Sequence, residues 1–224
     1  YVHIPFCRSM GWYWGCHTII TRQDEPITDY LAALRREIIA VTDIVGAPTG
    51  VGHIHFGGGT PTIIAPDAFH NLLGLLRERF RVVDNAEIAV EIDPRSLASA
   101  MAAALADAGV TRVSFGVQTF DPMVQKAINR VQSFEQTAAA VTTLRSSGVK
   151  GVNFDLIYGL PQQTVQSCIE TVEKCLELWP DRFSVFGYAH VPSFKKHQRK
   201  IVESDLPDSE RRFAQAEAIA AALV

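Results

Sequence analysis

The sequence predicts an α/β protein with a parallel sheet built from six strand–helix units. Short apolar runs alternate along the chain with longer segments whose apolar residues recur at helical spacing. Strands that alternate with helices form parallel sheets with right-handed crossovers. Six units build an open doubly wound sheet or a partial barrel, because a closed (β/α)8 barrel needs eight.

The boundaries of the predicted elements follow from the apolar runs and from the residues that begin or end helices. We expect strands at residues 1–5, 52–56, 88–92, 112–117, 152–158 and 183–188. We expect helices at residues 27–43, 67–80, 96–108, 164–178 and 209–224, and helical segments over residues 121–147. Thr28 is the predicted N-cap of the first helix. Gly109 and Gly148 close two later helices, and Pro180 stops another.

Composition and charge exclude several classes of protein. The 224 residues are 47% hydrophobic and 20% charged, which is ordinary for a globular protein and unlike a disordered chain, a collagen-like repeat or a coiled coil. A formal net charge of −3 gives no signal for nucleic-acid or anionic-membrane binding. No apolar run approaches the roughly 20 residues of a membrane span, and no secretion signal opens the chain. We therefore expect a cytoplasmic monomer, with further chain before residue 1, which already lies within a predicted strand.

The four cysteines fall into two pairs. In a reducing compartment disulfides are rare, so the default is four free thiols. Cys168 and Cys175 are seven positions apart on an amphipathic helical pattern and therefore share a face. We expect both to be small buried residues. Cys7 and Cys16 lie in a segment that follows the first predicted strand.

Nearly every unusual cluster of residues directly follows a predicted strand, where barrels and open sheets carry their sites. These clusters are 6–18, 56–62, 91–95, 116–118, 155–161 and 188–192. The triple glycine at 57–59 is neither a dinucleotide fingerprint nor a P-loop, because the later glycine and the Gly-Lys-Ser/Thr of those motifs are missing. It indicates either close approach of a polar ligand to the backbone or a tight turn before Pro61.

Three further features leave alternatives open. His53 and His55 share a strand face, which suits a metal, although no third ligand lies nearby in sequence. Glu91 and Asp93 are either a general acid/base pair or a strand-end carboxylate followed by a turn. The basic run at 195–200 either binds an anionic substrate or is a solvated loop.

Taken together, the order of these motifs resembles the radical S-adenosylmethionine enzymes, most of all the oxygen-independent coproporphyrinogen III oxidases. The resemblance covers the whole chain and rests on residues 1–7, 57–62, 91–95, 116–118, 129–130, 155–161, 188–192 and 197–201. The Gly15-Cys16 pair and the 197–201 run favour this oxidase over the related haem chaperones. The resemblance implies a three-quarter (β/α)6 TIM-like barrel, with residues 1–224 as the radical SAM core. It also implies an N-terminal segment and a C-terminal domain outside this core.

The resemblance implies the oxidative decarboxylation of coproporphyrinogen III to protoporphyrinogen IX in haem biosynthesis. The implied cofactors are a 4Fe–4S cluster and two molecules of S-adenosylmethionine, and the implied electron donor is flavodoxin- or ferredoxin-like. The first S-adenosylmethionine is expected at Tyr1, Gly58 and Glu91. The second is expected at Tyr13, Gly59, Thr60, Gln118, Arg130, Asp155 and Ala189.

The implied cluster ligands carry a defect in this sequence. The family positions fall on Cys7, Gly11 and Trp14, so only the first is a cysteine, and Cys16 matches an extra cysteine that is not a ligand. Iron–sulfur clusters require thiolates, with histidine as an occasional substitute. We therefore expect impaired radical chemistry in this chain. The alternatives are a non-catalytic S-adenosylmethionine- or porphyrin-binding relative, similar to the haem chaperones, or an unrelated enzyme that uses Glu91 and Asp155 as acid and base.

Overall fold

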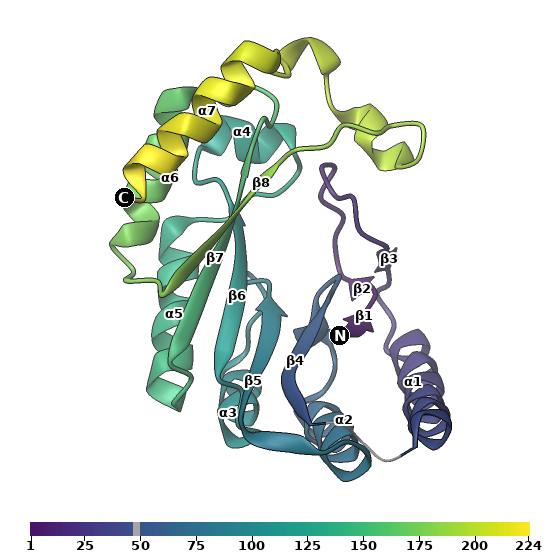
Figure 1. The fold of residues 1–224 in the computed structure, drawn as a ribbon. Helices are drawn as coiled ribbons and strands as arrows, with labels where there is room; N and C mark the ends of the chain where they lie inside the picture. The colour runs from purple at the N-terminus through teal and green to yellow at the C-terminus, as the bar shows by residue number, and fades with distance from the viewer. Residues whose placement is uncertain (47–49) are drawn as a thin grey trace. The chain divides into compact units, whose positions relative to one another are not determined.

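The computed structural model describes residues 1–46 and 50–224 and has the predicted α/β architecture (Figure 1). Its main sheet has six strands, β1 (Val2–Ile4), β4 (Val51–Gly58), β5 (Val82–Ile92), β6 (Arg112–Gln118), β7 (Gly151–Tyr158) and β8 (Arg182–Gly187). They lie side by side in chain order. A doubly wound sheet reverses its strand order at a switch point, whereas a barrel does not. The sequential order therefore agrees with the predicted partial barrel.

Two short strands, β2 (Phe6–Cys7) and β3 (Ile19–Ile20), form a separate parallel pair that the sequence analysis did not predict. The α-helices are α1 (Glu25–Val45), α2 (Pro66–Arg79), α3 (Ser99–Asp107), α4 (Pro122–Ala127), α5 (Phe134–Ser147), α6 (Val165–Leu176) and α7 (Ser209–Ala222). The 3-10 helices are η1 (Pro61–Ile63), η2 (Lys196–Lys200) and η3 (Glu203–Asp205). Each predicted helical segment contains at least one α-helix, so the alternation of strands and helices is confirmed.

Several predicted boundaries were wrong. Strand β5 begins at Val82 and not at residue 88. Helix α1 begins two residues early, with Asp24 and not Thr28 as the N-cap and Pro26 in the first turn, while Thr28 donates from its hydroxyl to the Asp24 carbonyl. Proline favours the first turn, where its missing N–H has no intrahelical partner to lose. The helical segments expected at 121–147 are two helices, α4 and α5, and between them Asn129 has the left-handed φ of 54°.

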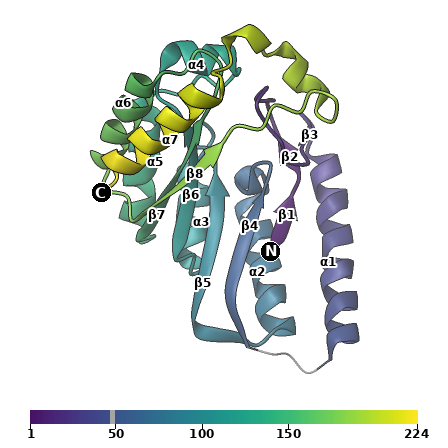
Figure 2. The ribbon, with the colours of Figure 1, turned by 45° about the horizontal axis from the view of Figure 1, so that its top comes forward.

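The chain divides into two compact units. Unit 1 comprises residues 1–9, 17–113 and 143–150, and unit 2 comprises residues 10–16, 114–142 and 151–224. In unit 1 the core lies between the sheet and α2, where the fully buried rings of Phe56 and Phe69 are 5.0 Å apart. In unit 2, α6 and α7 lie side by side, as both ribbon views show (Figure 2).

The buried face of α6 carries Cys168 and Cys175, which are 1% and 0% exposed. Both thiols are free, and burial raises the pKa of Cys168 to about 12. The prediction that they are small buried residues is confirmed. Among the described residues, no helix is both long enough and apolar enough to cross a membrane.

Candidate functional site

The glycine turn that follows β4 lies directly against the first strands of unit 1. Gly59 N donates to Ile4 O and Thr60 N donates to Phe6 O, both at 2.9 Å. Gly58 has a φ of +122°, and a Cβ there would lie 2.8 Å from Ile4 O. A Cβ at Gly59 would lie 2.7 Å from Phe6 O. The backbone contact therefore requires glycine at both positions, which confirms the tight-turn interpretation.

Glu91, at the end of β5, joins this turn to Tyr1. Its carboxylate accepts from Gly58 N at 3.2 Å and lies 3.1 Å from His55 Nε2. A Cβ at Gly57 would lie 2.5 Å from the Glu91 carboxylate and 2.9 Å from the Tyr1 ring, so this glycine allows both to approach. The Tyr1 ring stacks on His55 with 5.7 Å between centroids. The side chain of Glu91 stays 36% exposed, so its carboxylate can still accept from a ligand ammonium.

Glu91 and Asp93 have separate partners. Arg95 binds Asp93 through two nitrogens, with Nε 2.9 Å from Oδ1 and Nη2 2.6 Å from Oδ2. Asp93 and Arg95 line a polar cavity of about 380 Å³ together with Cys7 and Thr60. The structure therefore gives Asp93 the turn-forming role, since Arg95 N also donates to its carboxylate at 3.1 Å.

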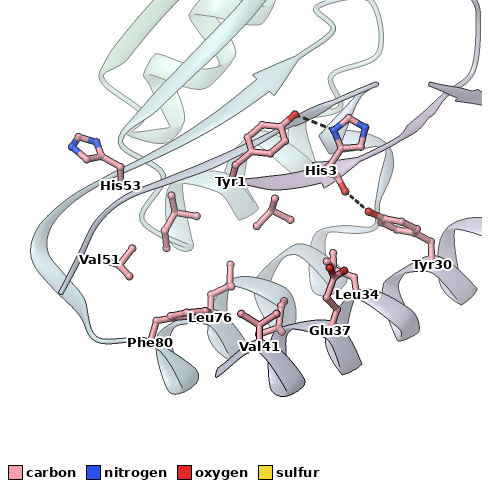
Figure 3. A pocket seen from close by; sticks show the side chains of 13 residues that line it. Tyr1, His3, Tyr30, Leu34, Glu37, Val41, Val51, His53, Leu76 and Phe80 are labelled. Atoms are coloured by element: carbon pink, nitrogen blue, oxygen red, sulfur yellow. Dashed lines mark hydrogen bonds between the residues drawn. The ribbon is translucent and has the colours of Figure 1, made fainter. Parts of the chain in front are cut away.

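A larger pocket of about 490 Å³ lies between β1, β4, α1 and α2 (Figure 3). Its lining is mainly apolar, and Tyr1 is the one predicted cofactor residue that contributes to it, together with His53, the candidate metal residue. His3 also lines it and receives a hydrogen bond from Tyr30 Oη at its carbonyl oxygen. The glycine turn and Glu91 do not line this pocket, so it shares only Tyr1 with the predicted cofactor residues.

The residues present do not fit a 4Fe–4S cluster. Cys7 is 2% exposed, and its Sγ lies 3.0 Å from Thr60 Oγ1. Gly11 has no side chain, and the indole of Trp14 offers no lone pair to a metal. Cys16 is exposed. Within residues 1–46 and 50–224, no three His, Cys, Asp or Glu side chains are grouped so that they could hold a metal ion, His53 and His55 included.

In unit 2, a second group of predicted site residues lies along β6. Ser114, Gly116 and Gln118 alternate along this strand and so share one face. Asp155 accepts from Ser114 Oγ at 2.8 Å. Arg130 donates to Gly116 O at 2.7 Å, and a Cβ on Gly116 would lie 2.8 Å from Gln118 Nε2 and 3.2 Å from Arg130 Nη2. Gln118, Arg130 and Asp155 are therefore brought together on one strand face.

Gln118 has two further unusual features. Its backbone is left-handed, with a φ of 66°, a conformation that only a few per cent of non-glycine residues adopt. Its Oε1 is buried and has no hydrogen-bond partner among the described residues. A buried acceptor without a partner costs free energy, which a ligand N–H at this position can recover. These observations fit a ligand-binding role for Gln118.

The last two predicted residues, Tyr13 and Ala189, are linked through Gln198. Gln198 Nε2 lies 3.2 Å from both Tyr13 O and Ala189 O. The sequence analysis missed Gln198, because a glutamine within a basic run carries no signal of burial. That the groups in units 1 and 2 converge on one site stays a prediction.

Comparisons with known proteins identify the family of this chain. The sequence-family model of the radical SAM superfamily matches residues 3–175 of this chain. The oxygen-independent coproporphyrinogen III oxidase of Bradyrhizobium diazoefficiens is 60% identical over 223 residues, which cover all of this chain and 50% of that protein. The corresponding oxidase of Paracoccus denitrificans is 42% identical over 212 residues, covering 95% of this chain and 47% of that protein. The chain thus spans about half the length of these curated relatives.

A solved structure gives the same result. Coproporphyrinogen III oxidase (HemN) from Escherichia coli, described as a radical SAM enzyme, superposes with a TM-score of 0.93 at 40% identity. The match covers 99% of this chain and 51% of that chain. The predicted radical SAM core fold is confirmed by this superposition. With the family model matching more than half of its residues, the chain belongs to the radical SAM superfamily.

Proposed function

We propose that this chain is the core of a protein of the oxygen-independent coproporphyrinogen III oxidase type. The 60% identity to the Bradyrhizobium oxidase over the whole chain supports this assignment. In the corresponding reaction, propionate groups of coproporphyrinogen III each lose a hydrogen atom, carbon dioxide and one electron, and become the vinyl groups of protoporphyrinogen IX. A flavodoxin- or ferredoxin-like electron donor, a cytoplasmic location and a monomeric state belong to the same proposal.

The residues that fit S-adenosylmethionine are retained in both units. In unit 1, the Glu91 carboxylate can accept from the ligand's ammonium group, and the glycine turn beside it lets Glu91 and Tyr1 approach each other closely. In unit 2, Gln118 Oε1 can accept from a second ligand. When bound and reductively cleaved, S-adenosylmethionine supplies the radical that abstracts hydrogen. The residues of this chain bind and orient the ligand.

The cluster that such cleavage requires has no ligand set in this chain. This is the observation that carries the functional conclusion, because Gly11 and Trp14 stand where two thiolates are needed. We propose that the chain as it stands is impaired in radical chemistry and binds S-adenosylmethionine weakly or not at all. Loss of one strong anchor from a multi-contact ligand commonly costs more than about a hundredfold in affinity.

A second candidate function is a non-catalytic protein that binds S-adenosylmethionine or a porphyrin. The observation that favours it is the intact geometry around Glu91, which keeps its bonds to His55 and Gly58 although two cluster positions have changed. In this alternative the protein contacts alone provide the affinity.

Anaerobic reconstitution with iron and sulfide, followed by calorimetric titration with S-adenosylmethionine, tests these proposals. We expect no cluster absorption near about 400 nm and weak or absent binding. Low-micromolar binding without iron, lost in Glu91→Gln and kept in the matched control Asp84→Asn, would establish the non-catalytic binder instead. Asp84 suits the control because it is an exposed carboxylate on the same strand. A stoichiometric cluster in the unaltered chain would overturn the proposed impairment and direct attention to His17 and Cys16 as ligands.

A further inference from the structure

The basic run at 195–200, whose role the sequence left open, binds the segment that carries the altered cluster positions. Three of its side chains reach backbone carbonyls of the Met10–Cys16 loop within unit 2. Lys195 Nζ donates to Cys16 O at 3.0 Å, and His197 Nε2 lies 2.7 Å from Trp14 O. Gln198 makes the third connection. The run is therefore not a fully solvated loop, although Lys196, Arg199 and Lys200 stay exposed.

Gln198 is the centre of this attachment. It is 0% exposed, although the residues on both sides are charged or polar. Its Nε2 lies 3.2 Å from Tyr13 O, 3.4 Å from Trp14 O and 3.2 Å from Ala189 O. Its Oε1 accepts from Val191 N at 2.6 Å. Because the amide group has two hydrogens and three nearby carbonyls, one hydrogen is shared, and the whole polar group is engaged.

The other side of the loop is fixed by packing. Tyr13 is 6% exposed and belongs to a hydrophobic cluster with Ile128 and Tyr188, against which the indole rings of Trp12 and Trp14 pack. The rings of Tyr13 and Trp14 meet edge to face, 6.2 Å apart. Two hydrogen bonds add to this packing, from Trp12 N to Ile128 O and from Asn129 Nδ2 to Met10 O, both 2.8 Å long.

We infer that the Met10–Cys16 loop of this chain is held in one conformation without iron, and that Gln198 is the positioning residue that fixes it relative to Ala189. Hydrogen bonds from η2 hold the backbone carbonyls of Tyr13 and Trp14 in this loop. The hydrophobic cluster holds the aromatic side chains of the loop. In a cluster-binding loop, metal–thiolate bonds contribute to this order, because metal binding and folding are coupled. Here the protein supplies the order itself, so Tyr13 is preset whether or not S-adenosylmethionine binds.

Hydrogen exchange on the chelator-treated protein tests the inference. We expect two backbone amides to be protected from exchange. The Trp12 amide donates to Ile128 O, and the Val191 amide donates to Gln198 Oε1. Gln198→Met keeps the side-chain volume and removes every polar contact. It should speed exchange of both amides about tenfold or more, since each lost hydrogen bond lowers the local opening free energy. The Phe154 amide in the core of β7 should be unchanged, which separates a positioning role from general destabilisation.

Lys196→Met is the matched control, because Lys196 is an exposed neighbour in the same 3-10 helix. It should leave all three amides unchanged. If Gln198→Met does not fold, Lys195→Met replaces it, since that variant removes only the bond to Cys16 O. Unprotected loop amides in the metal-free chain, protection that arises only when iron is added, or no difference between the Gln198 and Lys196 variants would each overturn the inference. None of these readouts depends on ligand binding or catalysis.

Discussion

Restoring cysteine at positions 11 and 14 perturbs two residues that the structure couples. A Cβ at Gly11 would lie 2.7 Å from Tyr13 Cε1 and 3.0 Å from Trp14 Nε1. Both rings belong to the packed aromatic cluster of unit 2, so neither can move without losing contacts. Gly11→Cys alone therefore overpacks the loop against both rings, whereas together with Trp14→Cys the contact with the indole is gone and only the contact with Tyr13 remains.

The expected magnitudes follow from this geometry. Overpacking at Gly11 should cost about 1–3 kcal/mol of unfolding free energy. Trp14→Cys should cost about 2 kcal/mol, below the range for a fully buried tryptophan because Trp14 is only partly buried. Independent effects would sum to about 4 kcal/mol. The double variant should fall short of that sum by about 1 kcal/mol, because residues in contact couple by such amounts.

Denaturant unfolding, monitored by circular dichroism, measures the coupling between the unfolding free energies of the two substitutions. Anaerobic reconstitution with iron and sulfide tests whether the introduced thiols bind a cluster. Gly15→Cys is the matched control, because a Cβ there meets no atom within 4 Å and position 15 is not a ligand position. The double variant should gain cluster absorption near about 400 nm and reductive cleavage of S-adenosylmethionine, while either single variant gains little. Additive unfolding energies would refute the packing argument. A full cluster in a single variant would refute the ligand argument.

Three further predictions concern stability and thiol chemistry. Thr164→Ala removes the capping box of α6 and should cost about 1 kcal/mol by denaturant unfolding. Exposed Cys16 should react quickly with a disulfide reagent in the native protein, whereas buried Cys168 and Cys175 should react only on unfolding; rapid modification of all three thiols would contradict their burial. Burial raises the pKa of Tyr188 from 10.0 to about 12, so the native state keeps a proton that the unfolded phenol releases. The stability contribution of Tyr188 is therefore complete below pH 10.0 and should decline as pH rises towards about 12, a decline that Tyr188→Phe should reduce.

The sequence predicted the order of strands and helices because apolar periodicity changes between the two kinds of element. It predicted helical segments at 121–147 but did not place the break between α4 and α5, where the apolar pattern continues without interruption. That break is stabilised by a tertiary feature. The buried Gln125 side chain donates to Thr119 O and Gln132 O and accepts from Gln132 N. A buried glutamine that bonds to three backbone groups has no local sequence signature.

The candidate site could also be predicted in part, because some of its residues lie next to strands that the sequence already indicates. The glycine turn and Glu91 lie next to strand ends, and the topology of a parallel sheet places such residues at one edge. Gln198 could not be predicted, because its role depends on carbonyls of Tyr13 and Ala189 that are remote in sequence. The periodicity of apolar residues indicates which side chains face a core. It does not indicate which backbone carbonyls accept a hydrogen bond from a distant side chain.

Gly11 and Trp14, the positions that the family resemblance assigns to cluster thiolates, are coupled by packing. A Cβ at Gly11 would lie 2.7 Å from Tyr13 Cε1 and 3.0 Å from Trp14 Nε1. Cysteine at position 11 is therefore expected to be unfavourable while Tyr13 and Trp14 keep their positions, and cysteine at position 14 alone removes aromatic packing without completing a ligand set. We expect each single substitution to lose stability and to form no cluster, so both changes are needed together. The contacts of Glu91 in unit 1 and the hydrogen bonds that hold the Met10–Cys16 loop in unit 2 then make S-adenosylmethionine affinity without iron the measurement that separates an impaired oxidase from a binding protein.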